Sequence, residues 1–222
     1  EIMSGDWSSD VCSSDLVVAD GMGGYVGGEI ASRTAVKSVA YYFSNYTHAS
    51  TEQLTKAIAY ANDCIISKII IDPSLEGMGT TLSLLSLVDS TAYWAHVGDS
   101  RIYLYRKGML KQITTDHTVI HELIEDHSIT TDEAEKHPQR HVLTRAVGVE
   151  KQLEIDSGSF TVMKGDRILL CSDGLSAALS EEEIASYLSL SEKTERQTVK
   201  DLFSRIYDEG APDNATVVLK TV

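Results

Sequence analysis

Apolar residues recur at helical spacing in two segments near the start of the chain, 29–43 and 52–70. The residues on one face of the second segment are Leu54, Ile58, Ala61 and Ile65. Thr51 stands just before this segment, where its hydroxyl can cap the first turn of a helix. The pattern therefore predicts two amphipathic helices, the second of them capped by Thr51.

Runs of apolar and β-branched residues elsewhere predict short strands. The expected strands cover residues 16–19, 80–88, 92–97, 102–105, 110–113, 153–162, 167–171 and 215–219. Several of them are separated only by short turn-like sequences, such as Asp89-Ser90 and Gly98-Asp99-Ser100. Connections of this length predict antiparallel pairing.

Two segments break this pattern. Residues 22–28 include four glycines and are expected to form a tight loop. Residues 116–140 are rich in charge and histidine, with short helices expected at 118–126 and, behind Thr131, at 132–136. We interpret this second segment as a mobile insert over a site, and not as a separate domain.

Two more helices are expected near the end of the chain, at 181–188 and 192–208. Ser180 and Glu183 have the spacing of a capping box before the first of them. Strands thus come in runs and helices in pairs, without the strict alternation of a doubly wound parallel sheet. The order predicts an α+β layered fold with antiparallel sheets inside and helix pairs outside.

Composition narrows the class of protein. The chain has 222 residues, which suits one domain, and its net charge of −14 disfavours nucleic acid and anionic membranes as partners. No apolar run is long enough for a membrane helix and no signal-peptide pattern opens the chain, so we expect a cytoplasmic protein. The three cysteines, Cys12, Cys64 and Cys171, have spacings that predict neither a disulfide framework nor a zinc site.

The first sixteen residues, EIMSGDWSSDVCSSDL, differ from the rest because they show neither helical nor strand periodicity. The part from Asp6 to Leu16 resembles the translation of a sequencing-adapter oligonucleotide. We therefore expect residues 1–16 to be a non-native or disordered leader, and residues 17–222 to be the domain, with an insert at about 117–142.

Three aspartates share one local setting at the ends of apolar strands. Asp20 and Asp173 each end such a strand and precede a glycine, and Asp213 precedes the last strand. A single Asp-Gly after a strand is usually only a turn, but three rigidly held carboxylates suit Mg²⁺ or Mn²⁺, which prefer oxygen ligands. Asp99 and Asp116 occupy two further acidic turns.

From Val17 onward the chain resembles the metal-dependent serine/threonine protein phosphatases of the type 2C (PPM) family, in its bacterial branch. The resemblance rests on motifs in the order of the family: VVADGMGG (17–24), GMGTT (77–81), HVGDSR (96–101), TTDHT (114–118), LTRAVG (143–148), LLCSDGL (169–175) and PDNATVV (212–218). It implies a four-layer αββα sandwich of two antiparallel sheets flanked by helix pairs, with a small flap insert.

The resemblance also implies roles for single residues. Asp20 would bridge two Mn or Mg ions, and the Gly21 carbonyl would ligate the second ion. Asp173 and Asp213 would complete the coordination of the first ion, while Asp116 and Asp173 would bind a third ion. Asp99 would be a turn residue, and the turn motifs around it would shape the floor of the site.

The implied reaction is hydrolysis of phosphoserine or phosphothreonine in proteins by a metal-bridging water. Cys171 is followed by no phosphate-binding loop, so no phosphocysteine intermediate is expected. Many eukaryotic family members carry a histidine, a candidate general acid, at the position of Met22, and a metal-bound water could protonate the leaving oxygen in its place. His117 is an alternative candidate here, although we expect its role to be structural. The histidines of the insert and Arg145 are also expected to be structural.

The family pattern further implies two strands before Val17, with a phosphate-binding arginine and another acidic residue, in place of residues 1–16. An alternative function is therefore a catalytically impaired metal-binding regulatory module. A phosphodiesterase or nuclease is disfavoured by the acidic balance. The expected partners are phosphoprotein substrates of a bacterial serine/threonine kinase, with no nucleic acid and no membrane, and the expected state is a monomer.

Overall fold

The computed structural model describes residues 15–45, 49–134 and 137–222. Its two main sheets are each antiparallel and four-stranded. The first sheet has the order β1 (Asp15–Val18), β4 (Leu82–Val88), β5 (Thr91–Val97) and β8 (Asp156–Thr161). The second has the order β10 (Val217–Thr221), β9 (Arg167–Cys171), β6 (Arg101–Arg106) and β7 (Met109–Gln112). A two-stranded ribbon pairs β2 (Gly21–Met22) with β3 (Gly79–Thr80).

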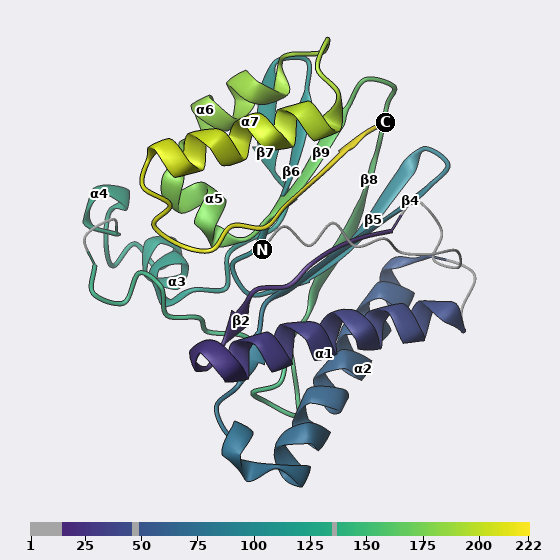
Figure 1. The fold of residues 1–222 in the computed structure, drawn as a ribbon, viewed down its shortest axis with the longest axis vertical. Coiled ribbons are helices and arrows are strands. Elements are labelled where there is room, and N and C mark those ends of the chain that lie inside the picture. The colour runs from purple at the N-terminus through teal and green to yellow at the C-terminus, as the bar shows by residue number, and fades with distance from the viewer. Residues whose placement is uncertain (1–14, 46–48, 135–136) are drawn as a thin grey trace.

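The helices lie outside the two sheets (Figure 1). Helices α1 (Gly24–Ser44) and α2 (Thr51–Ile71) cover the first sheet, and η1 (Pro73–Leu75) follows them. On the other side lie α5 (Asp173–Ala178), α6 (Glu181–Leu188) and α7 (Glu195–Asp208). The short helices α3 (Val119–Glu125) and α4 (Thr131–Ala134) belong to the insert, which extends from one end of the sheets.

Alternation along the strands produces three hydrophobic layers, because successive side chains point to opposite faces. In β4, Leu84 packs with α1 and α2, whereas its neighbour Leu85 packs between the sheets. In β9, Leu169 packs with α6 and α7, whereas Leu170 faces the first sheet. Helices, sheet, sheet and helices therefore form the four-layer αββα sandwich expected from the sequence.

Several helix boundaries differ from the predicted ones. Helix α2 includes Thr51, and its N-cap is Ser50, whose hydroxyl accepts a hydrogen bond from Gln53 N at 3.3 Å. Helix α7 begins only at Glu195, because Thr194 and Gln197 form a capping box there. The predicted capping box of Ser180 and Glu183 is confirmed at the start of α6.

The expected loop at 22–28 is wrong. These residues form the end of the ribbon and the first turns of α1, whose N-cap is Gly23. The glycines serve close packing: a Cβ on Gly21 would lie 2.0 Å from the Gly28 carbonyl oxygen, and one on Gly28 would lie 2.6 Å from the Gly21 oxygen. The start of α1 can therefore approach the backbone that follows β1.

Other differences are smaller. Strand β8 begins at Asp156 and not at 153, β10 lies two residues later than expected, and α5 was not predicted. The expected helix at 132–136 is only the single turn of α4, and its last predicted residues lie outside the described part. Of the expected leader, Asp15 and Leu16 belong to β1, while residues 1–14 lie outside the described residues.

Candidate metal centre

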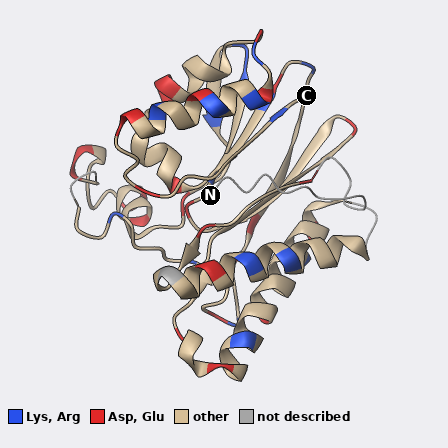
Figure 2. Ribbon diagram, in the orientation of Figure 1, with Lys and Arg blue, Asp and Glu red and all other residues tan. Residues whose placement is uncertain are grey.

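Acidic loops meet where β1, β5 and β9 end and β10 begins. Asp20 follows β1, Asp99 lies in the turn between β5 and β6, Asp173 opens α5 after β9, and Asp213 precedes β10. Figure 2 shows acidic residues on the outer helices and also along the loops between the two sheets. The fold therefore gathers four carboxylates from four separate parts of the chain.

The backbone of Asp20 is held by the two threonines of the GMGTT motif. Its N–H donates to Thr81 Oγ1 at 2.9 Å, and its carbonyl oxygen accepts from Thr81 N and Thr80 Oγ1, each at 2.8 Å. Thr81 Oγ1 in turn contacts Ser100 Oγ at 2.7 Å, next to Asp99. The motif shapes the floor of the site and links the Asp20 turn to the Asp99 turn.

Glycines bring the acidic turns close together. Gly98 has a φ of 107°, and a Cβ there would lie 2.6 Å from Thr81 Cγ2. A Cβ on Gly174 would lie 2.3 Å from the Asn214 carbonyl oxygen. The turn of Asp99 is therefore seated on Thr81, and the start of α5 with Asp173 is seated on the loop that carries Asp213.

The electrostatics of these carboxylates are those of a cation site. Burial, followed by repulsion from Asp173, Asp99 and Asp213, raises the pKa of Asp20 to about 7. Burial and repulsion from Asp173 and Asp116 raise the pKa of Asp99 to about 7. The pKa of Asp173 is also raised, by burial and by Asp213, while its hydrogen bond with Asp20 opposes the shift. A divalent cation among these groups would favour their ionised forms.

The oxygen donors suit a Mg²⁺ or Mn²⁺ site that keeps water ligands better than a site in which the protein supplies every ligand. Among the residues that the structure describes, no three acidic, histidine or cysteine side chains converge tightly enough to enclose an ion. Magnesium-type sites keep several waters and use only one or two carboxylates per ion. Carboxylates supplied by four separate loops, with a backbone carbonyl at Gly21, are compatible with that pattern.

Asp116 adds to the repulsion on Asp99, but its own oxygens are held by Arg101 and Gln112. Its Oδ1 accepts from Arg101 Nε at 3.0 Å and Gln112 Nε2 at 2.8 Å, and its Oδ2 accepts from Arg101 Nη2 at 2.6 Å. A carboxylate neutralised by a bidentate guanidinium has little capacity left for a metal ion. Asp99, predicted to be only a turn residue, is instead the carboxylate that shares the field of Asp20 and Asp173.

His117 takes part in a buried network. Its Nδ1 accepts from Gly98 N at 3.1 Å, and its Nε2 lies 3.3 Å from Asp156 Oδ2. Burial lowers the pKa of His117, and the neighbouring His96 has its pKa lowered to about 4 by burial. These contacts favour a structural role for His117, which helps to hold the turn before Asp99.

Two other residues named from the sequence also have structural surroundings. Arg145 pairs with Glu154 at 3.2 Å and with Asp156 at 3.0 Å. Cys171 is fully buried, and burial raises the pKa of its thiol to about 12, so it stays protonated at neutral pH. A protonated, buried thiol cannot serve as the nucleophile of a cysteine phosphatase.

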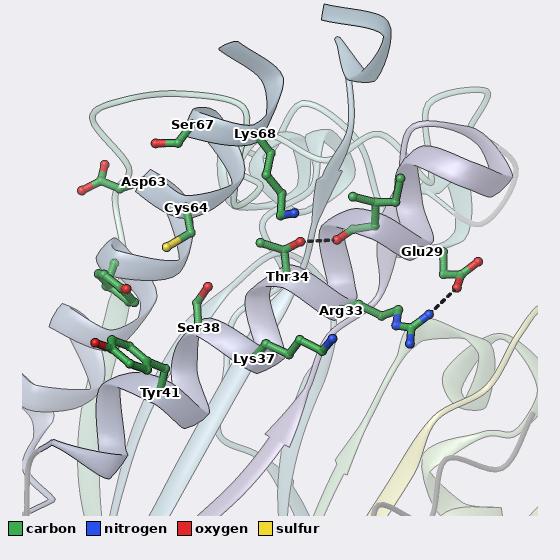
Figure 3. A pocket seen from close by; sticks show the side chains of 12 residues that line it. Glu29, Arg33, Thr34, Lys37, Ser38, Tyr41, Asp63, Cys64, Ser67 and Lys68 are labelled. Atoms are coloured by element: carbon green, nitrogen blue, oxygen red, sulfur yellow. Dashed lines mark hydrogen bonds and ion pairs between the residues drawn. The ribbon is translucent and has the colours of Figure 1, made fainter. Parts of the chain in front are cut away.

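A groove of about 720 Å³ lies elsewhere, on the outer face of α1 and α2 (Figure 3). Lys37 and Lys68 line it from different helices, and Arg33 at its edge pairs with Glu29 at 3.0 Å. None of the four clustered carboxylates lines this groove. The groove is therefore separate from the candidate metal centre.

Comparison with known proteins identifies the family of the chain. The family described as "Protein phosphatase 2C" matches residues 5–215, so the chain belongs to that family. It is 38% identical over 208 residues to the serine/threonine protein phosphatase PstP of Mycobacterium tuberculosis, and it covers 40% of PstP's length. The serine/threonine phosphatase stp of Listeria monocytogenes is 35% identical over 209 residues, with 82% of its length covered. These matches span 93% and 92% of the present chain.

Solved structures of relatives have the same fold. The crystal structure of M. tuberculosis PstP/Ppp superposes with a TM-score of 0.88 at 36% identity, covering 96% of this chain and 89% of that one. The PstP catalytic domain in complex with two manganese ions has a TM-score of 0.84 at 34% identity, covering 94% and 87%. The predicted family and the predicted fold class are therefore confirmed.

Proposed function

We propose that this chain hydrolyses phosphoserine and phosphothreonine in proteins, with Mn²⁺ or Mg²⁺ as cofactor. The observation that carries the proposal is the carboxylate cluster, in which Asp20 shares a hydrogen bond with Asp173 and has its pKa raised to about 7. The relatives support the proposal, because PstP and stp are described as serine/threonine phosphatases and the PstP catalytic domain binds two manganese ions.

The residues of the chain would divide the ligand roles by position. Asp20, Asp173 and Asp213 would hold the first ion, and Asp20 with the Gly21 carbonyl would hold the second. For a third ion the contacts favour Asp99 with Asp173, because Asp116 is engaged by Arg101. Held by these residues, such ions would supply charge neutralisation for the phosphate and would lower the pKa of a water that could attack phosphorus.

The protein itself contributes rigidity and shape. Thr80 and Thr81 fix the Asp20 backbone, so the carboxylate needs little reorganisation when it binds a cation. Asp213 is exposed and Asp20, Asp99 and Asp173 are half-buried, so a phosphorylated segment would approach the site from the side of Asp213. A protein kinase must phosphorylate such a substrate first. We expect this kinase to be a bacterial serine/threonine kinase. Among the described residues no helix is long and apolar enough to cross a membrane.

The test compares wild type with Asp173→Asn on a phosphothreonine peptide, with and without Mn²⁺. We expect Mn²⁺-dependent phosphate release that EDTA abolishes, and a loss of at least about a hundredfold in the variant. Asp63→Asn, an exposed substitution on α2, is the matched control and should keep the wild-type rate. Manganese binding in calorimetry without any phosphate release would instead support the alternative of a metal-binding regulatory module.

A further inference from the structure

Two exposed apolar side chains converge beside the metal centre. A Cβ on Gly79 would lie 3.0 Å from Val149 Cγ2 and 3.4 Å from Met22 Cγ, so these side chains flank the same buried glycine. Met22 is 37% exposed and Val149 is 54% exposed. Single exposed apolar residues are ordinary on protein surfaces, but two that meet over one backbone position form a continuous apolar surface.

The backbone fixes this arrangement. Met22 pairs with Gly79 in the β2–β3 ribbon. On the other side of β3, Thr80 N donates to Val147 O at 3.0 Å and Val147 N donates to Thr80 O at 2.9 Å. Three chain segments are thus hydrogen-bonded side by side, and Met22 and Val149 are carried on the two outer ones. Val149 lies in the turn two residues after Val147, so this pairing brings its segment next to that of Met22.

Met22 lies close enough to the carboxylates to contact a substrate bound there. Met22 is two residues after Asp20, and with trans peptide bonds their Cα atoms are at most about 7.6 Å apart. In a peptide whose phosphate enters the carboxylate cluster, the residues on either side of the phosphorylated one have Cα atoms about 3.8 Å from it. A flanking side chain of the substrate can therefore reach Met22, and Val149 lies beside Met22 over Gly79.

We propose that Met22 and Val149 form an apolar shelf that binds the side chain next to the phosphorylated residue of a protein substrate. The proposal rests on the phosphatase function proposed above and deepens it, because it names a substrate class: phosphoserine or phosphothreonine segments with a Leu-, Ile- or Val-type neighbour. The acidic surroundings attract basic segments at longer range in a salt-dependent way, whereas contact with the shelf is insensitive to salt.

Kinetics on a pair of phosphothreonine peptides test the shelf. The two peptides differ only in carrying Leu or Gly on both sides of the phosphothreonine. For wild type with Mn²⁺ we expect kcat/KM to be about fivefold higher for the Leu peptide, mainly through KM, at both low and high salt. In the double variant Met22→Ser/Val149→Ser this ratio should fall below about twofold. A ratio taken within each protein cancels any change in the amount of folded enzyme.

The matched control is Met109→Ser/Val88→Ser, which removes an exposed Met and an exposed Val from strands outside the ribbon. This control should keep the fivefold ratio. A wild-type ratio near one, or a ratio that survives in the shelf variant, would overturn the proposal.

A second readout separates the shelf from catalysis. Phosphonate analogues of the same two peptides cannot be hydrolysed, and their Kd values in the presence of Mn²⁺ can be measured by fluorescence anisotropy. We expect the same fivefold preference in Kd and its loss in the shelf variant. A preserved Kd ratio without hydrolysis of either phosphopeptide would overturn the proposed function but support the shelf, whereas equal Kd values for wild type would overturn the shelf.

Discussion

Aspartates occur in two contrasting settings in this molecule. At the sheet junction Asp20, Asp99 and Asp173 face one another, and burial with mutual repulsion raises their pKa values. On the second sheet Asp166 is paired with Arg106, whose Nε and Nη2 lie 2.9 and 2.6 Å from its two oxygens. The pKa of Asp166 is lowered, chiefly by its hydrogen bonds with that guanidinium. An aspartate paired with an arginine of the protein therefore stabilises the fold. The clustered aspartates have no such partner among themselves and would need an added metal ion to balance their charge.

The paired setting should show the largest effect on stability. Asp166 is only 3% exposed, and Asp166→Asn removes its charge and one of the two oxygens that accept from Arg106. We expect a loss of about 3 kcal/mol in the free energy of unfolding, measured in urea, because charge-assisted hydrogen bonds at a buried carboxylate are lost. Asp201→Asn breaks a surface pair with Lys193 in which both side chains are 37% exposed, and it should cost less than about 1 kcal/mol. Equal losses in the two variants would contradict the contrast.

The unpaired setting should respond to added metal. Mn²⁺ at about one hundred times its Kd should stabilise the folded chain by about 2.7 kcal/mol and raise Tm by roughly 5–10 °C. The reason is that cations bound by Asp20 and Asp173 relieve the repulsion between them. Differential scanning calorimetry would measure the shift, which EDTA should reverse. Asp173→Asn should lose most of it, and Asp166→Asn should keep it despite starting from a lower Tm.

The smallest effect concerns the pH dependence of the metal-free chain. Because the folded-state pKa of Asp99 lies near 7, above its ordinary 3.8, the folded chain binds more protons than the unfolded chain between these values. Stability contributed by protonated Asp99 is therefore lost as pH rises from about 4 to about 7. In EDTA, Asp99→Asn should be on the order of 1–2 kcal/mol more stable than wild type at pH 8, with no gain at pH 4.

Urea unfolding at the two pH values would measure this gain. Asp63→Asn serves again as the control, because the side chain is exposed on α2 and lies outside the cluster. If the control and Asp99→Asn gave the same pH dependence, the repulsion inferred for the sheet junction would be contradicted.

Strand-end position predicted three of the acidic turns that the fold brings together. Asp20 and Asp173 end apolar strands and Asp213 precedes one, and the fold does bring these turns into one field. Asp99 could not be distinguished in the same way, because Gly98-Asp99-Ser100 has the composition of an ordinary tight turn. Its importance comes from Gly98 packing on Thr81, a contact between residues 17 positions apart that no local pattern records.

The contacts of Asp116 could not be predicted from the local sequence either. In sequence it is one more acidic turn residue, and only tertiary structure shows that Arg101 and Gln112 engage both of its oxygens. Layer order was easier to predict, since period-two alternation in β4 and β9 directly encodes which side chains face helices and which face the other sheet. Packing of glycine on backbone, as at Gly21 and Gly28, was mistaken for a loop because both uses favour the same residue.

The glycine contacts beneath the acidic turns bear on how a variant without the proposed activity should be prepared. Gly21, Gly98 and Gly174 each lie where a Cβ would come within 2.6 Å of another residue, so replacing them displaces the turns themselves. The neighbouring carboxylates can be replaced by amides of the same shape without changing these glycine contacts. A reagent meant to capture phosphoproteins from a cell extract should therefore be built at Asp173 or Asp213, where the docking surface keeps its native shape, and not at the glycines.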